Sequence, residues 1–176
     1  CDLIPCSGGH PEWHIQKDVC SIINGDCLFK TADGTEHRVG KWSGVIAFPP
    51  CTYLTVTGNR WFSPKEDPDG IRAKKREEAV KFFSMFYNLD IDFVAIENPI
   101  GIMSTRLCPP TQIVEPSWFG DAYEKKTCLW LKGFPKLVPT DIVSVPKPVK
   151  FASGRTMSVW YRDSWNLPKK QRALFR

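Results

Sequence analysis

Two consecutive prolines, Pro49 and Pro50, follow an apolar run at residues 46–48 and strongly restrict this part of the chain. Together they remove two backbone hydrogen-bond donors and bias the residues before them toward extended conformations. The pattern therefore predicts a short buried strand that stops at the prolines. The next residue, Cys51, is expected just beyond the carboxyl end of that strand.

This position makes Cys51 a candidate nucleophile. In open α/β sheets, ligands bind in the loops beyond the carboxyl ends of the strands, and a cysteine thiolate held there can attack an electrophilic carbon. The alternative interpretation is a buried structural cysteine, because unpaired cysteines often pack in protein cores.

A second strand end favours the catalytic interpretation. Residues 93–96 form another short run of β-favouring residues, and Glu97-Asn98-Pro99 follows directly. A carboxyl group and an amide are thus expected beyond a second strand, which is again stopped by proline. A thiol and a carboxyl group at two strand ends predict one shared site.

The two motifs together resemble a known family. Pro49-Pro50-Cys51 followed by Glu97-Asn98-Pro99 is similar to the Pro-Pro-Cys and Glu-Asn-Val signatures of DNA cytosine-5 methyltransferases, most closely of a small branch often carried by phages. The resemblance extends from Asp2 to about Pro139. It implies an α/β, Rossmann-like methyltransferase fold with a doubly wound, mostly parallel sheet. The first strand of that sheet and its glycine-rich cofactor turn are expected upstream of Cys1.

The resemblance also implies catalytic roles. Cys51 would attack carbon 6 of cytosine, so that carbon 5 becomes enamine-like and accepts a methyl group from S-adenosylmethionine. Glu97 would hold a proton near N3 and the amino group of the base, with its pKa raised by burial. Asn98 would orient the carboxyl group of Glu97.

Further positions are implied for the cofactor and the substrate. Asp18 lies in a segment resembling the one that meets the adenine of S-adenosylmethionine, although it could instead be a helix N-cap. Lys125 aligns with an arginine of the family, and as lysine it lacks the bidentate guanidinium fork. The expected cofactor-binding residues are Asp2, Asp18, Val19 and Pro50, and the expected substrate-binding residues are Pro49, Thr52 and Lys125.

DNA is the implied partner. The target carbon of a paired cytosine is inaccessible inside a duplex, so the substrate would be a flipped-out or single-stranded cytosine. Residues 52–61 are interpreted as a mobile loop over the substrate. The basic and aromatic stretch from Arg155 to Arg176 either grips the nucleic acid or is a plain basic surface.

The remaining pattern predicts secondary structure around these motifs. Residues 2–4 are expected to end a strand, and residues 27–31 and 35–39 to form a hairpin around Asp33-Gly34. Apolar residues at helical spacing predict a helix over 71–87, whose charged run at 74–78 would face water. The other expected elements are strands at 113–115 and 127–131.

The helix at 71–87 has further consequences. Its expected core face consists of Ile71, Ala79, Phe82, Phe83 and Phe86. With the strands before and after it, the helix predicts a parallel strand-helix-strand unit. Residues 1–140 are interpreted as the catalytic domain, and residues 141–176 as a proline-rich, basic extension of it.

Composition narrows the setting. Seven cysteines at irregular spacing, with no secretory leader before them, favour free thiols and a cytoplasmic location. No apolar run approaches about 20 residues, so no membrane span is expected. Cys1, Cys6, His10 and His14 are spaced too loosely to predict a zinc site. A net charge of +5 is compatible with a polyanionic partner without requiring one.

Three other functions stay open at this point. One is a related pyrimidine-modifying enzyme that acts on a free nucleotide, and another is a catalytically idle DNA-binding module. An amino-group methyltransferase also carries Pro-Pro at a strand end, but Phe48 and Cys51 flank the prolines here, where such enzymes carry a polar residue before them and an aromatic residue after them. That mismatch favours methylation of carbon.

Overall fold

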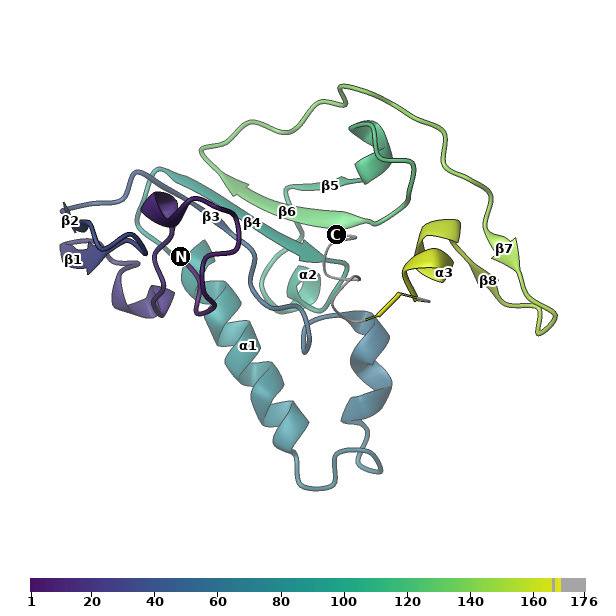
Figure 1. Cartoon of the computed structure of the whole chain (residues 1–176). Helices are drawn as coiled ribbons and strands as arrows, with labels where there is room; N and C mark the ends of the chain where they lie inside the picture. Colours follow the sequence, from purple (N-terminus) through teal and green to yellow (C-terminus); the bar gives the residue numbers. More distant parts are fainter. Residues whose placement is uncertain (166, 169–176) are drawn as a thin grey trace.

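A four-stranded mixed sheet forms the centre of the computed structural model, which describes residues 1–165, 167 and 168 (Figure 1). The strand order is β3-β4-β6-β5. β3 and β4 run parallel, whereas β6 runs antiparallel to both β4 and β5. The strands span Gly44–Ala47 (β3), Phe93–Pro99 (β4), Gln112–Val114 (β5) and Thr127–Lys132 (β6).

The α/β class expected from the sequence is therefore confirmed, but a mostly parallel sheet is not. The expected strands at 113–115 and 127–131 exist, yet the chain between them turns back as a hairpin. Parallel neighbouring strands need a long crossover connection, usually a helix. Among the connections between the strands of this sheet, only the one from β3 to β4 contains a helix that is several turns long.

That crossover is α1, Ile71–Tyr87, which matches the predicted helix. It packs its aromatic side chains against one face of the sheet, where Phe83 is fully buried and meets the Trp130 ring edge-on at 5.0 Å. Two details of the helix prediction are wrong. Ile71 is 56% exposed at the first turn, and Arg76, in the middle of the charged run, is half-buried.

The opposite face of the sheet is open. Ile46 and Phe48 are 66% and 71% exposed, so the expectation of a fully buried strand is wrong for β3. Side chains alternate between the two faces of a strand, and α1 packs on only one of them. Ile46, Phe48, Leu129, Leu131, Phe134 and Leu137 line an apolar groove of about 320 Å³ on the open face.

The N-terminal part forms little regular structure. The predicted hairpin is confirmed as β1, Cys27–Lys30, paired with β2, Glu36–Val39. The strand expected at residues 2–4 is replaced by a single bridge between Asp2 and Gln16, since Pro5 interrupts the ladder. Two 3₁₀ helices, Pro11–Trp13 (η1) and Val19–Ser21 (η2), complete this part.

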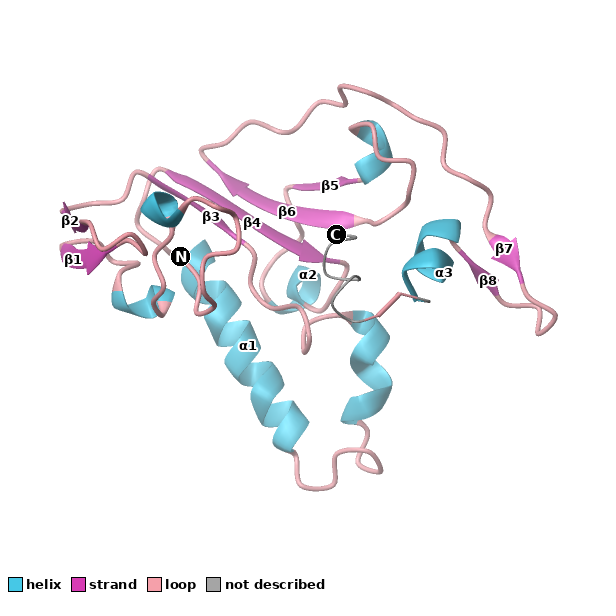
Figure 2. Ribbon diagram, in the orientation of Figure 1, coloured by secondary structure: helices cyan, strands magenta, loops and turns pink. Residues whose placement is uncertain are grey.

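Short elements surround the sheet (Figure 2). Residues 140–143 are attached to the turn after β5 by backbone hydrogen bonds, and β7 then pairs with β8. Within residues 1–165, 167 and 168, no helix has both the length and the apolar character that crossing a membrane requires. These elements are η3 (Val56–Phe62), α2 (Met103–Arg106), η4 (Pro116–Trp118), β7 (Val149–Lys150), β8 (Thr156–Met157) and α3 (Val159–Trp165).

Candidate active site

The end of β3 carries the candidate nucleophile. Pro49 is buried and Cys51 is partly exposed, so the thiol is not sealed inside the core. The Cys51 carbonyl accepts hydrogen bonds from the backbone N–H groups of Leu54 (2.9 Å) and Thr55 (3.1 Å). Because Leu54 is fully buried, this turn is fixed to the core directly after the cysteine.

Glu97 and Asn98 lie at the end of the neighbouring strand, β4. Adjacent residues of a strand point to opposite faces, so Asn98 points toward the α1 side and is 2% exposed, whereas Glu97 points to the open face. The Asn98 Nδ2 donates a hydrogen bond to the Pro49 carbonyl at 2.8 Å, and its Oδ1 is buried without a partner. Asn98 therefore joins the two strand ends. The sequence predicted that it would orient the Glu97 carboxyl group, but its side chain makes no hydrogen bond to Glu97.

The environment of Glu97 favours its neutral form. Burial raises the pKa of Glu97 above its ordinary value, and the positive charge of Lys125 opposes that rise only in part. The charge of Lys125 thus acts on the carboxyl group of Glu97. Its backbone N–H donates to Glu115 Oε2 at 2.8 Å, which fixes the loop before β6.

A cavity of about 460 Å³ lies beside the free edge of β3. Its lining contains all four residues that the sequence assigns to the cofactor, Asp2, Asp18, Val19 and Pro50, and also Pro49. The rings of Phe82 and Phe86 from α1 form another part of the wall. Residues from three distant segments of the chain therefore meet along β3 and the two prolines. Cys51 and Glu97 are not among the lining residues, and Glu97 instead lines the groove on the open face.

The lining of this cavity suits the adenosine part of S-adenosylmethionine. Carboxylates accept hydrogen bonds from ribose hydroxyls, and aromatic rings cover a flat base. One Asp18 oxygen already accepts from the Cys20 backbone N–H at 2.9 Å, so Asp18 is the N-cap of η2 as well as a wall residue. Asp2 Oδ1 likewise accepts from the Ile4 backbone N–H at 3.2 Å, so the second oxygen of each carboxylate is the acceptor that a ligand would use.

Residues 52–61, interpreted from the sequence as a mobile loop, form a turn and the helix η3. Two arginines of α1 contact this segment: Arg76 donates from Nε to the Tyr53 carbonyl at 2.9 Å, and Arg72 lies over the Tyr53 ring. Sequence reasoning missed both: it assigned the charged run at 74–78, which includes Arg76, to solvent, and it assigned no contact to Arg72. Their i, i+4 spacing next to the predicted loop was the only signal available.

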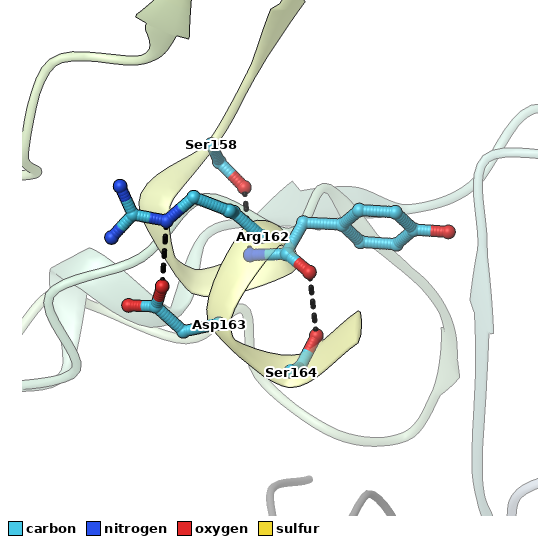
Figure 3. A network of polar contacts seen from close by, with 5 residues as sticks. Ser158, Arg162, Asp163 and Ser164 are labelled. Carbon is cyan, nitrogen blue, oxygen red and sulfur yellow. Dashed lines mark hydrogen bonds and ion pairs between the residues drawn. The ribbon is translucent and has the colours of Figure 1, made fainter. Parts of the chain in front are cut away.

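The C-terminal helix α3 has its own polar contacts (Figure 3). Arg162 Nε forms an ion pair with Asp163 at 2.7 Å, so this cation of the basic stretch is already balanced. Trp160 stacks on Tyr123 with ring centroids 4.8 Å apart, which connects α3 to the Lys125 loop. The other expected basic residues Lys169, Lys170, Arg172 and Arg176 lie outside the described residues.

Comparisons with protein-family models, with curated proteins and with solved structures found no match to this chain. Within the described part of the chain, no three histidine, cysteine, aspartate or glutamate side chains gather in a way that could hold a metal ion.

Proposed function

We propose that this protein transfers a methyl group from S-adenosylmethionine to carbon 5 of cytosine in DNA, through a covalent bond to Cys51. The observation that carries the proposal is the hydrogen bond from Asn98 to the Pro49 carbonyl. It joins the strand end with the thiol to the strand end with the carboxyl group. The motifs that suggested the reaction from the sequence thus lie side by side at one edge of the sheet, at carboxyl ends of parallel strands.

The electrostatics of Glu97 support the same reaction. A carboxyl group with a raised pKa holds its proton more readily than an ordinary one and could donate it to N3 of the base, where negative charge develops when the thiolate adds to carbon 6. Lys125, on the same side, provides a cation near the polar edge of the base. Bound S-adenosylmethionine would supply the methyl group, with Asp2 and Asp18 at its adenosine part.

The proposed reaction has three steps, and Cys51 and Glu97 act in the first of them. Cys51 forms a bond from sulfur to carbon 6, and Glu97 stabilises the electron density that moves into the ring. After carbon 5 is methylated, its proton leaves to a base and the carbon–sulfur bond breaks, which restores the aromatic ring and the free thiolate. The proposed setting is the cytoplasm, with a flipped-out or single-stranded cytosine as substrate.

Trapping with 5-fluorocytosine tests the proposal. A fluorine at carbon 5 cannot leave as a proton, so the enzyme should stay covalently bound to DNA after methyl transfer. The expected result is a protein–DNA adduct, stable to denaturation, that requires S-adenosylmethionine and maps to Cys51 by mass spectrometry. Cys51→Ser should form no adduct while keeping the wild-type circular dichroism spectrum.

The same assay separates the alternative functions. An adduct with 5-fluorodeoxycytidine monophosphate but not with DNA would indicate an enzyme acting on free nucleotides. Folded wild-type protein that binds DNA and forms no adduct would contradict the proposed reaction and favour a module without catalysis.

A further inference from the structure

Two arginines on α1, Arg72 and Arg76, lie side by side against the segment that follows Cys51. Their guanidinium carbons are 5.4 Å and 3.3 Å from the centre of the same Phe62 ring. Arg72 also lies 5.6 Å from the centre of the Tyr53 ring. One helical turn separates the two residues, and aromatic faces attract guanidinium groups, so the rings hold two like charges together.

The carboxylates near this arginine pair are engaged elsewhere. Glu77 forms an ion pair with Arg106 at 2.5 Å. Asp67 accepts hydrogen bonds from the backbone N–H groups of Arg72 and Ala73, both at 2.9 Å. Within the described residues, no carboxylate forms an ion pair with Arg72 or Arg76. Asp67 and Glu77 thus act electrostatically on the two arginines without forming an ion pair with either guanidinium.

The two arginines differ in the donors that they have left. Arg76 donates from Nε to the Tyr53 carbonyl at 2.9 Å and from Nη2 to Asn59 Oδ1 at 2.8 Å, so it fixes the segment after Cys51. Arg72 makes no side-chain hydrogen bond within the described part of the chain, and its Nε is buried without a partner. The guanidinium lies over the Tyr53 and Phe62 rings, and its two Nη groups, which are not among the buried unpaired atoms, are the donors that an incoming oxyanion could reach.

We infer that Arg72, supported by Arg76, binds a backbone phosphate of the DNA strand whose cytosine enters the site. The inference rests on the proposed function, because that function makes DNA the partner. Guanidinium groups bind phosphate oxygens through two parallel hydrogen bonds. Extracting a base from the stack costs a few kcal/mol and requires contacts that hold the strand. The arginine pair is placed to make such a contact, because it lies beside Tyr53, two residues after Cys51.

The neighbouring surface of η3 fits the same ligand. Arg60 lies over the ring of Trp61 at 4.5 Å, and Trp61 is 41% exposed. Proteins that bind single-stranded nucleic acid combine cations along the backbone with exposed rings on which bases stack. The phosphate site of Arg72 and the Trp61 ring would thus contact consecutive parts of one strand.

The salt dependence of DNA binding tests this inference. Binding of a fluorescent single-stranded oligonucleotide containing one cytosine is measured by anisotropy at a series of salt concentrations, without S-adenosylmethionine. Arg72→Gln should weaken binding about tenfold at low salt and reduce the slope of log K against log salt by about 0.7. Lys74→Gln removes the same charge from an exposed position on another side of α1 and should leave the slope near the wild-type value.

A second variant keeps the test decisive. Arg72→Met retains the aliphatic stem that packs on Phe62, so it should fold even if Arg72→Gln does not, and it should show the same loss of slope. A folded Arg72→Met protein whose slope equals that of Lys74→Gln would overturn the inference. If the Arg72 variants lose slope but the wild-type protein forms no Cys51 adduct, the phosphate site stands and the proposed reaction is rejected. If the wild-type protein forms the adduct but the Arg72 variants keep the wild-type slope, the reaction stands and the phosphate site is rejected.

Discussion

At the scale of single residues, Asn98 determines how the two strand ends meet. Its side chain is 2% exposed and spans from β4 to the carbonyl of Pro49, two residues before the candidate nucleophile. A proline cannot donate a hydrogen bond, so the end of β3 has few other ways to attach to its neighbour. The position of Cys51 therefore depends on an amide that is itself buried.

Asn98→Ala is expected to lower the free energy of unfolding by about 1–3 kcal/mol, because the Pro49 carbonyl becomes buried without its donor. Urea unfolding followed by circular dichroism measures the change. The rate at which iodoacetamide alkylates Cys51 in the folded protein should change as well. Asn88→Ala, the same substitution at an exposed position, is the control, and equal losses in both variants would contradict the assigned role of Asn98.

Glu97 makes stability depend on pH. Its pKa is raised in the folded protein and ordinary in the unfolded chain, so the carboxyl favours folding below the ordinary pKa and loses that contribution as pH rises through the folded pKa. Glu97→Gln cannot ionise. Its unfolding free energy should exceed that of the wild type by about 1 kcal/mol at pH near 8, and the difference should disappear at about pH 4.

Urea unfolding across this pH range checks the sign. Glu66→Gln changes an exposed carboxyl group and should show no comparable trend. A difference between Glu97→Gln and wild type that stays constant with pH would mean that Glu97 is not held in its neutral form.

At the scale of elements, α1 and the end of β3 were predictable because each has a local cause. The end of β4 was predicted too early: the strand continues through Glu97 and Asn98 to Pro99, because these residues pair with β6. Phe82, Phe83 and Phe86 recur at helical spacing. Pro49 lacks a backbone N–H group and therefore ends the strand before it. The contacts of Arg72 and Arg76 were not predictable, because their partners in the Tyr53 segment are set by tertiary packing.

The open face of the sheet shows a related limit of sequence patterns. Ile46 and Phe48 have apolar side chains, so the sequence predicts that both are buried, but both are exposed. Which face of a strand becomes covered depends on where the helices pack, and α1 covers only the side of Ala47 and Ile96. The direction of β6 was missed for the same reason, since pairing is decided between elements.

Gly101 couples two of these elements. It forms a bridge with Thr55 just beyond β4, and a Cβ at this position would lie 2.3 Å from the Leu54 carbonyl oxygen. Gly101→Ala should therefore push the turn after Cys51 away from β4 and lower the unfolding free energy by about 1–3 kcal/mol. Thermal unfolding measures this, with Gly8→Ala, whose added Cβ meets nothing within 4 Å, as the control. Equal melting temperatures for the two variants would contradict the coupling.

At the scale of the whole molecule, the described part of the chain from residue 140 onward is attached to the segments around the sheet by backbone hydrogen bonds and by an aromatic stack. Four backbone hydrogen bonds join residues 140, 141 and 143 to residues 117, 118 and 120 around η4. Further along, the stacking of Trp160 on Tyr123 connects α3 to the Lys125 loop. The first attachment spans the boundary expected between residues 140 and 141, so the chain up to residue 143 belongs structurally with the sheet.

Two truncations separate these attachments. A chain ending at residue 148 loses the aromatic stack, worth about 0.5–1.5 kcal/mol, and should still unfold cooperatively. A chain ending at residue 138 also loses the four backbone hydrogen bonds, each worth about 0.5–1.5 kcal/mol, and should be several kcal/mol less stable. Urea unfolding of both chains measures the difference. If the two chains are equally stable, residues 140–143 add nothing to the sheet and the folded unit ends before them. A larger loss of stability in the shorter chain would show that the folded unit includes this segment.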